Sequence, residues 1–362
     1  MASPQDDYAA NLARLASEKR DEVEQAVAYF AQLPLDAAKT REVSQALNRA
    51  DRPSFCTLTL PALVVWGTAD NVPLLMRMLR EEGVERRAML DLAQAWNDPR
   101  LIEVLVEVLE QPFDDGRRAE EILAAWGPEA DALLARHMNH PNDEAHGRLK
   151  SVFEKRKTSP TLLARQAAAD LASTNAQTQE YAAEWLATAA EIPAELHAAV
   201  CGAALAMVKS KRGFDRLHAN QLIGRCATVE HNAAFLALLA SPVAEEWQAG
   251  LQGVLATGDV AGAKALALRM TDPAFTGLVA RTMQEFGPQS EDLALAILKQ
   301  SVNKEQPAAH LGMAHVLRDL GGRKSLAALK SLAARRGIPD SINTGARDAA
   351  AHIEQRLKAG PS

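Results

Sequence analysis

The chain has 362 residues, of which 48% are hydrophobic but only 4% are aromatic, so its apolar content is mostly Ala, Leu and Val. This composition suits closely packed helices and argues against a β-rich core, which favours β-branched and aromatic residues. The formal net charge of −6 also argues against a nucleic-acid binder, because such proteins usually carry a basic excess.

The N-terminal residues 1–20 are polar and charged, without the apolar core of a signal peptide. No run of about 18 apolar residues exists, so no membrane span is expected. The three cysteines, Cys56, Cys201 and Cys226, are odd in number and form no C-x-x-C motif, which indicates neither a disulfide framework nor a thiolate zinc site. We therefore expect a soluble, cytoplasmic protein with buried free thiols.

Apolar residues recur at helical spacing along nearly the whole chain, and Pro, Gly, Asn or Asp interrupt them at intervals of about 12–18 residues. Three tryptophans, Trp66, Trp96 and Trp126, follow one another at a spacing of about thirty residues, each closing an apolar stretch before a turn. A fixed period of this length is typical of stacked repeats. We expect each Trp to be a buried wedge between neighbouring repeats.

The segment 97–110 shows how one repeat begins. Asp98 can cap a helix that has Pro99 at its first position. The apolar residues that follow form one wide stripe, while the glutamates face away from it. Such a helix cannot bury its stripe alone, so it needs a neighbouring helix.

Three segments resemble the second helix of HEAT repeats, of the type also found in phycobilin-lyase-like proteins. They are Arg86-Arg87-Ala88 with Leu90-Asp91-Leu92, Asp115-Gly116-Arg117-Arg118-Ala119 with Leu123, and Asn142-Asp143 followed by Arg148, Val152 and Phe153. The resemblance implies an all-α fold, a right-handed α-solenoid of about ten stacked antiparallel helix pairs. It also implies that the turn Asp and the helix Arg link neighbouring repeats. HEAT repeats serve many unrelated tasks, so the resemblance predicts fold better than function.

A second level of repetition predicts two homologous halves at an offset of about 160 residues. Trp66-Gly67-Thr68 aligns with Cys226-Ala227-Thr228, and further matches keep the same order, namely Asn97-Asp98 with Gly258-Asp259, Trp126-Gly127-Pro128 with Phe286-Gly287-Pro288, and Arg156-Lys157 with Arg323-Lys324. We therefore predict a capping helix or tail over 1–20, halves at 21–165 and 166–335, and a C-terminal capping helix and tail over 336–362.

No residue is predicted to be catalytic, to bind a cofactor or to bind a metal. The histidine-rich run around His137, His140 and His146 is interpreted as a solvated turn, because Pro141 separates His146 from the other two. His-Glu dipeptides, which HEAT-type enzymes resembling deoxyhypusine hydroxylase use to bind iron, do not occur in this sequence. The residues expected to take part in an interaction are basic, namely Arg156, Lys157, Arg323 and Lys324.

The preferred hypothesis is a non-enzymatic scaffold that binds a protein or peptide on the concave surface of the solenoid, because stacked repeats form an extended groove that needs no ordering on binding. One alternative is a lyase-like HEAT enzyme or enzyme accessory. A second alternative is nucleic-acid binding through basic helix edges. A monomer without cofactor or membrane association is expected.

Overall fold

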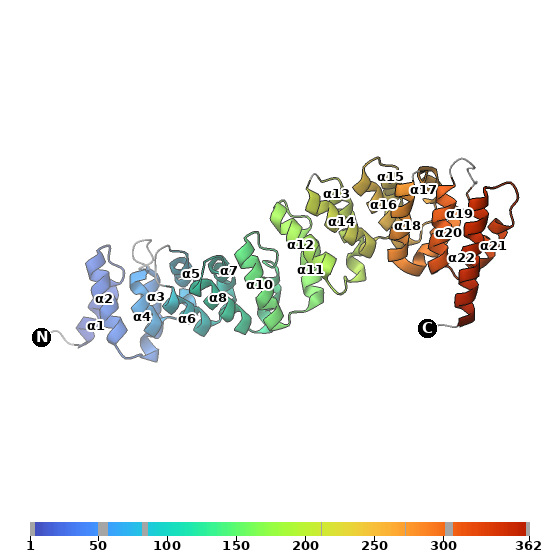
Figure 1. Ribbon diagram of the computed structural model, residues 1–362. Coiled ribbons are helices and arrows are strands. Elements are labelled where there is room, and N and C mark those ends of the chain that lie inside the picture. The colour runs from blue at the N-terminus through green and yellow to red at the C-terminus, as the bar shows by residue number, and fades with distance from the viewer. Residues whose placement is uncertain are drawn as a thin grey trace. The chain divides into compact units, whose positions relative to one another are not determined.

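The structure is a computed structural model that describes residues 4–49, 57–81, 86–210, 212–271, 273–300 and 307–359. These residues form two compact units, Met1–Gln166 and Ala167–Ser362, which are considered separately below (Figure 1). Within the described ranges there is no strand, so the predicted all-α class is confirmed. No helix in these ranges combines the length and the apolar character needed to cross a membrane.

The first unit contains the helices α1 to α10, and α11 lies across its boundary. Their bounds are α1 Pro4–Arg14, α2 Arg20–Gln32, α3 Ala37–Arg49, α4 Leu60–Trp66, α5 Val72–Arg80, α6 Arg87–Trp96, α7 Ile102–Leu109, α8 Asp114–Ala125, α9 Asp131–Ala135, α10 Asp143–Arg156 and α11 Pro160–Asp170.

The second unit continues with α12 Ala176–Thr188, α13 His197–Val208, α14 Gly213–Cys226, α15 Asn232–Leu239, α16 Ala244–Thr257, α17 Ala263–Arg269, α18 Pro273–Phe286, α19 Glu291–Leu298, α20 Ala308–Leu320, α21 Arg323–Ala333 and α22 Asp340–Ala359. Short 3₁₀ turns precede many odd-numbered helices, at Ala69–Asn71, Pro99–Leu101, Pro128–Ala130, Ala194–Leu196, Val229–His231 and Gly287–Ser290, and one at Thr57–Thr59 precedes α4.

Consecutive helices form antiparallel pairs, and the pairs stack in two layers within each unit. In the first unit α2, α4, α6, α8 and α10 pack one against the next, and in the second unit α12, α14, α16, α18, α20 and α22 do the same. Odd-numbered helices form the other layer, as the packing of α5 on α7 and of α17 on α19 shows. The predicted stack of helix pairs is therefore confirmed.

Both ends of the chain enter this stack. Helix α1 packs on α2 and α3, and α22 packs on α20 and α21, so these terminal segments form ordinary helix pairs over their described residues.

The turns that the sequence alignment matched share local geometry. Asn97 and Gly258 each end an even-numbered helix in the left-handed conformation, with φ of 47° and 68°. Asp98 and Asp259 follow them, and each carboxylate accepts a hydrogen bond from a backbone N–H two residues later. These likenesses agree with a duplication, which stays a prediction.

The periodic tryptophans differ in burial. Trp66 is fully buried, and its Nε1 donates to the backbone oxygen of Phe30 on α2 at 2.8 Å. Trp126 is 8% exposed. Trp96, predicted to be buried, is only half-buried, because it closes the short helix α6 at its open end. Its ring still packs on Gly67 of the preceding repeat, where an added Cβ would lie 2.6 Å from Cζ2.

Two glycines bring α16 close to α15. A Cβ added at Gly250 would lie 2.7 Å from the backbone of α15, and one added at Gly253 would lie 2.3 Å from the ring of Phe235. Phe235 is fully buried, so it has no free volume into which to move. This helix pair therefore depends on residues without a side chain at both positions.

We predict that Gly253→Ala lowers the free energy of unfolding by about 1–3 kcal/mol through overpacking. The matched control is Gly277→Ala on α18, where an added Cβ meets nothing within 4 Å. The control should be neutral or stabilising by roughly 0.5–1 kcal/mol, because Ala favours helix more than Gly does. Urea denaturation measures both, and equal effects at the two positions would contradict the close packing.

Candidate functional site

Arg156, one of the predicted interaction residues, is occupied within the fold. It is the last residue of α10, and its guanidinium donates to the backbone oxygens of Leu123, Trp126 and Gly127 at 2.9, 2.7 and 2.7 Å. The same group pairs with Asp131 at 2.6 Å, and its side chain is only 4% exposed. Arg156 is therefore not a surface contact, and its assignment to an interaction surface is corrected.

The other three predicted interaction residues are exposed. Lys157 follows α10 in the left-handed conformation with φ of 54°. Arg323 and Lys324 begin α21, and Lys324 forms an ion pair with Asp292. One basic dipeptide thus ends a helix and the other begins one, so their alignment in the predicted duplication does not hold. An interaction role for Lys157, Arg323 and Lys324 stays a prediction.

Arg156 has two structural counterparts at other even-numbered helices. Arg225 of α14 donates to the backbone oxygens of Leu186 and Ala187 at the end of α12, at 2.8 and 2.7 Å. Arg356 of α22 donates to the final carbonyls of α20, including that of Arg318 at 3.1 Å. Each arginine thus satisfies carbonyls that the end of a helix leaves without an intrahelical partner.

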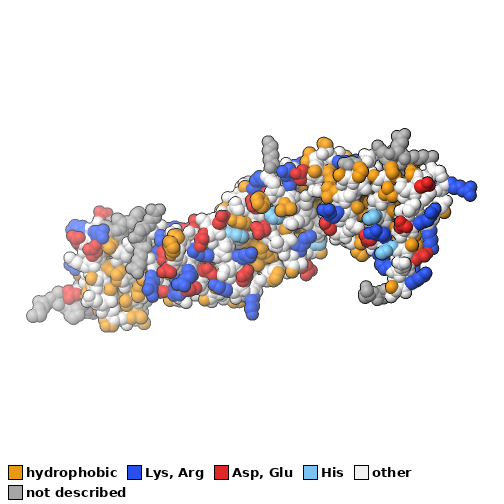
Figure 2. All heavy atoms as spheres, in the orientation of Figure 1, with side chains coloured by type: hydrophobic (Ala, Val, Ile, Leu, Met, Phe, Trp, Pro, Cys, Tyr) orange, Lys and Arg blue, Asp and Glu red, His pale blue; other side chains and the backbone are white. Residues whose placement is uncertain are grey.

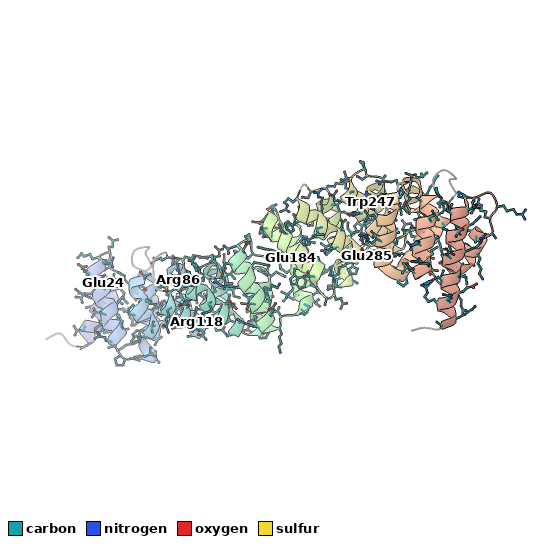
Figure 3. All side chains as sticks on the ribbon, viewed as in Figure 1. Glu24, Arg86, Arg118, Glu184, Trp247 and Glu285 are labelled. Atoms are coloured by element: carbon teal, nitrogen blue, oxygen red, sulfur yellow. The ribbon has the colours of Figure 1, made fainter. Side chains whose placement is uncertain are left out.

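A second set of arginines serves the odd-numbered layer. Arg86 donates to Leu79 O and Glu81 O at the end of α5, at 2.9 and 2.8 Å (Figure 3). Arg148 reaches Leu109 O and Gln111 O after α7, and Arg269 reaches Leu239 O and Ser241 O after α15. In each case the two acceptors are two residues apart at the end of the helix. We call these six side chains the arginine clamps: Arg86, Arg148, Arg156, Arg225, Arg269 and Arg356.

The charged residues that carry the HEAT resemblance form ion pairs with residues outside the expected pattern. Asp115 contacts Arg86 of the preceding repeat at 3.4 Å, whereas Arg118 pairs with Asp91 at 2.9 Å. Arg148 pairs with Glu144 of its own helix at 2.6 Å. The arginines do connect neighbouring repeats, as implied, but through other acceptors.

On the even-numbered layer of the first unit, a hollow of about 390 Å³ lies between α6 and α8. Arg118 spans it by donating to Asp91 and Gln94 of α6 at 2.9 and 2.5 Å (Figure 3). The lining carries both signs of charge, and its residues are Arg87, Leu90, Asp91, Asp114, Asp115, Arg117, Arg118 and Glu121. Such a surface offers donors and acceptors in fixed positions.

Phe113 lies beside this hollow, directly before Asp114. Its side chain is 85% exposed, and its backbone has φ of 63° and ψ of −134°. These angles are those of the first central position of a type II′ turn, where glycine is the usual residue. The chain thus places a large exposed aromatic ring at a backbone position that costs on the order of 1–3 kcal/mol of strain. Nothing in the sequence pattern indicated this turn type.

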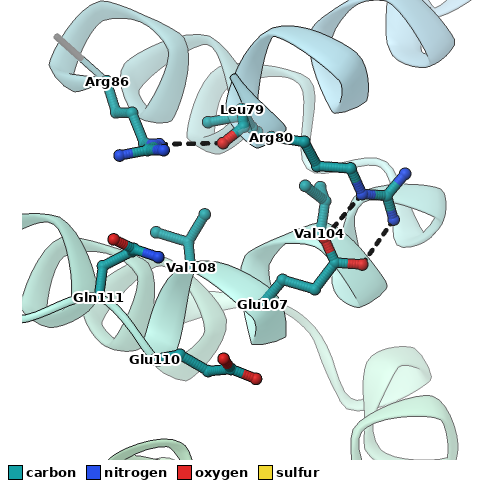
Figure 4. A pocket seen from close by; sticks show the side chains of 8 residues that line it. All are labelled: Leu79, Arg80, Arg86, Val104, Glu107, Val108, Glu110 and Gln111. Atoms are coloured by element: carbon teal, nitrogen blue, oxygen red, sulfur yellow. Dashed lines mark hydrogen bonds and ion pairs between the residues drawn. The ribbon is translucent and has the colours of Figure 1, made fainter. Parts of the chain in front are cut away.

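A second hollow, of about 430 Å³, lies between α5 and α7 in the odd-numbered layer (Figure 4). Arg80 and Glu107 form a bidentate pair on one side with both contacts at 2.6 Å, and Arg86 is bound to Leu79 O on the other. Arg80, Glu107 and Arg86 therefore already bind one another or the backbone. Glu110 lies 3.5 Å from Nε2 of His140, and Gln111 is the remaining polar side chain of the lining.

The histidine-rich run takes part in the turn between α9 and α10. Nδ1 of His140 accepts from the backbone N–H of Asn142 at 3.2 Å, and Nδ1 of His146 lies 2.9 Å from the backbone oxygen of Met138. Burial lowers the pKa of His137, with a further contribution from His140. Over the ranges that the structure describes, no three His, Cys, Asp or Glu side chains are grouped to hold a metal ion.

Cys201 and Cys226 are buried free thiols, and burial raises the pKa of each to about 11. Both therefore stay protonated at neutral pH and are poor nucleophiles. Cys56 lies outside the described residues.

We predict that Arg156→Met lowers the free energy of unfolding by about 3–5 kcal/mol, because Asp131 and three backbone oxygens lose their buried cationic partner. Lys150→Met, on the exposed side of the same helix, should change it by less than about 0.5 kcal/mol. Chemical denaturation measures both variants. Equal midpoints for Arg156→Met and the unchanged chain would show that the clamp adds no stability.

No family model matches the chain, and no curated protein matches it. Among solved structures, an engineered protein aligns with 96% of this chain and 99% of its own, at 14% identity and a TM-score of 0.34. An archaeal HEAT-like repeats protein from Thermococcus onnurineus NA1 aligns with 78% of this chain and 96% of its own, at 13% identity and a TM-score of 0.30.

Kap121p aligns with 96% of this chain at 11% identity and a TM-score of 0.37, and this chain spans about half of its length, namely 46%. Likenesses at these scores are distant, and they say nothing of function. The helix packing within each unit is what establishes the architecture: the described residues form stacked antiparallel helix pairs, as in an α-solenoid.

Proposed function

We propose that this protein is a non-enzymatic scaffold that binds a protein or peptide partner on its layer of even-numbered helices, which we take as the concave surface expected from the sequence. In the first unit the partner contacts the hollow between α6 and α8 and the exposed ring of Phe113. Phe113 is the single observation that carries this proposal.

The first support for this proposal is the free-energy cost of placing Phe113 at this backbone position. A glycine there would remove the backbone strain, and a polar residue would remove the exposed apolar ring. Backbone strain of this kind is concentrated at functional sites, so its presence favours a role for the side chain. Aromatic residues are also the commonest anchors of protein interfaces, since they offer a large contact area with few rotatable bonds.

The rigidity of the surroundings is the second support. Arg118 joins α8 to α6, and Lys155 joins α10 to α8 through Glu120 at 2.6 Å. Side chains held in place before binding lose little entropy on association. The mixed charges of the hollow suit the polar backbone and side chains of a peptide, while Phe113 supplies an apolar anchor beside them.

We predict opposite effects of Phe113→Gly on stability and on binding. Removing the strain should raise the free energy of unfolding by about 1 kcal/mol, because glycine adopts this φ without steric cost. Thermal denaturation measures that gain. Loss of the anchor should abolish capture of the partner, or weaken it by about tenfold or more.

Binding is measured by affinity capture from native cell extract, followed by titration of the purified partner. The matched control is Phe214→Ala on α14, another exposed aromatic residue, with 63% of its side chain accessible. The control should capture the same partner as the unchanged chain. Capture of the same proteins by Phe113→Gly, or no specific capture by the unchanged chain, would overturn the proposal.

A further inference from the structure

Three neighbouring odd-numbered helices of the second unit, α13, α15 and α17, present a solvent face almost without charge. The segments 196–208 and 231–244, which contain α13 and α15, include no Asp, Glu, Lys or Arg. Helix α17 has two cations, but Arg269 is a clamp on α15, which leaves Lys264 as the exposed one. Most helices of this layer are different, since α7 exposes glutamates and α21 begins with Arg323 and Lys324.

The three helices are contiguous. Gly202 of α13 lies against His231, just before α15, where an added Cβ would be 3.7 Å from Nε2. Arg269 at the end of α17 donates to Leu239 O and Ser241 O after α15, at 2.6 and 2.8 Å. The small and apolar side chains exposed there therefore form one continuous surface, which we call the uncharged face; it includes Ala199, Gly202, Ala206, Ala233, Ala237 and Leu268. Its centre lies on α15, and the exposed charges Lys209, Glu230 and Lys264 border it.

Large apolar side chains stand out from this face. Leu268 is 70% exposed, and Val229 and Val260 at its edges are 72% and 47% exposed. In Figure 2 the corresponding region is mostly orange and white, with few charged atoms. A helix that is apolar on all sides is normally covered on all sides, so α13 and α15 have the composition of buried helices but one open face.

The absence of charge at the centre of this face limits which partner surface can cover it. A partner that brings a charged side chain to its centre would have to bury that charge without a counter-ion, which is costly. The partner surface must therefore be uncharged as well. A second copy of this chain meets that requirement without further assumption, because two identical faces meet when the copies are related by a two-fold axis.

The size of the face sets the strength of the contact. Helices of 12, 8 and 7 residues, at 1.5 Å per residue and 8–10 Å apart, cover roughly 400 Å² in projection. A ridged surface has more accessible area than its projection, so each copy can bury about 400 Å² or somewhat more, which is below the roughly 800 Å² per partner of a standard stable interface. A dimer held by this face alone should be reversible.

We propose that the uncharged face of α13, α15 and α17 is the contact surface of a symmetric, reversible homodimer. The dimer closes on itself, so it does not extend into filaments. Its dissociation constant should be on the order of 10 µM, as fits an interface near the small end of the specific range. This proposal is independent of the surface around Phe113 and opposes the monomer expected from the sequence.

Sedimentation of the full chain from about 1 to about 200 µM tests the proposal around that dissociation constant. The disruptive variant is Ala237→Glu, which places a charge at the centre of the face on α15. The matched control is Ala327→Glu, an equally small exposed residue on α21, outside the face but in the same layer. Circular dichroism checks that both variants retain the helical content of the unchanged chain.

The expected result is a monomer–dimer equilibrium in the unchanged chain and in Ala327→Glu, with dimerisation weakened about a hundredfold or more in Ala237→Glu. A chain that is monomeric at every concentration overturns the proposal. The same result is expected if a different protein covers the face. A dimer that survives in Ala237→Glu, or that is lost equally in both variants, overturns it too. If Ala237→Glu fails to fold, Ala233→Lys replaces it under the same criteria.

Discussion

The stack depends on how the ends of its helices are satisfied. Each α-helix leaves its last four backbone carbonyls without an intrahelical partner, and a stack of short helices multiplies such ends. Among the described residues six arginines donate to carbonyls at or just beyond helix ends, three in each layer. Because Arg148 and Arg156 reach back to α7 and α8, the same bonds that finish one helix also attach the next. The same hydrogen bonds thus cap one helix and attach the next repeat to it. The positive charge of the arginine is also favourable beside the negative C-terminal end of the helix dipole.

This arrangement explains how the helices of each layer are held together although the chain has few aromatic residues. Close contact through Gly250 and Gly253 brings α15 and α16 together, and the arginine clamps then hold the helix ends. A surface built on such a frame changes little on binding. That is the condition under which an exposed, strained residue such as Phe113 can act as an anchor, since the frame holds the turn in place without the partner.

Much of the fold follows from residue patterns that act locally. Asp98 with Pro99 predicted a helix start that the structure contains, and the spacing of Trp66, Trp96 and Trp126 predicted the repeat. Partners across the layers could not be predicted in this way. Arg156 stands in a basic run with Lys155 and Lys157. Only the packing of α10 on α8 shows that its guanidinium is buried while the ammonium groups of the two lysines stay exposed. Phe113 was missed because its backbone conformation carries no sequence signal when the residue is not glycine. Helix caps and apolar stripes depend on residues a few positions apart in the sequence. The arginine clamps depend on which helix ends meet in the fold, and the sequence alone does not reveal this.

Hydrogen exchange at the ends of the even-numbered helices tests the central role of the clamps most directly. Helices α8, α12 and α20 end at carbonyls bound by an arginine, whereas among the described residues no arginine donates to the final carbonyls of α16. Since exchange there requires the last turn to open, amides in the final turns of α8, α12 and α20 should exchange more slowly than those of α16. Equal or faster exchange at the three clamped ends would contradict the account.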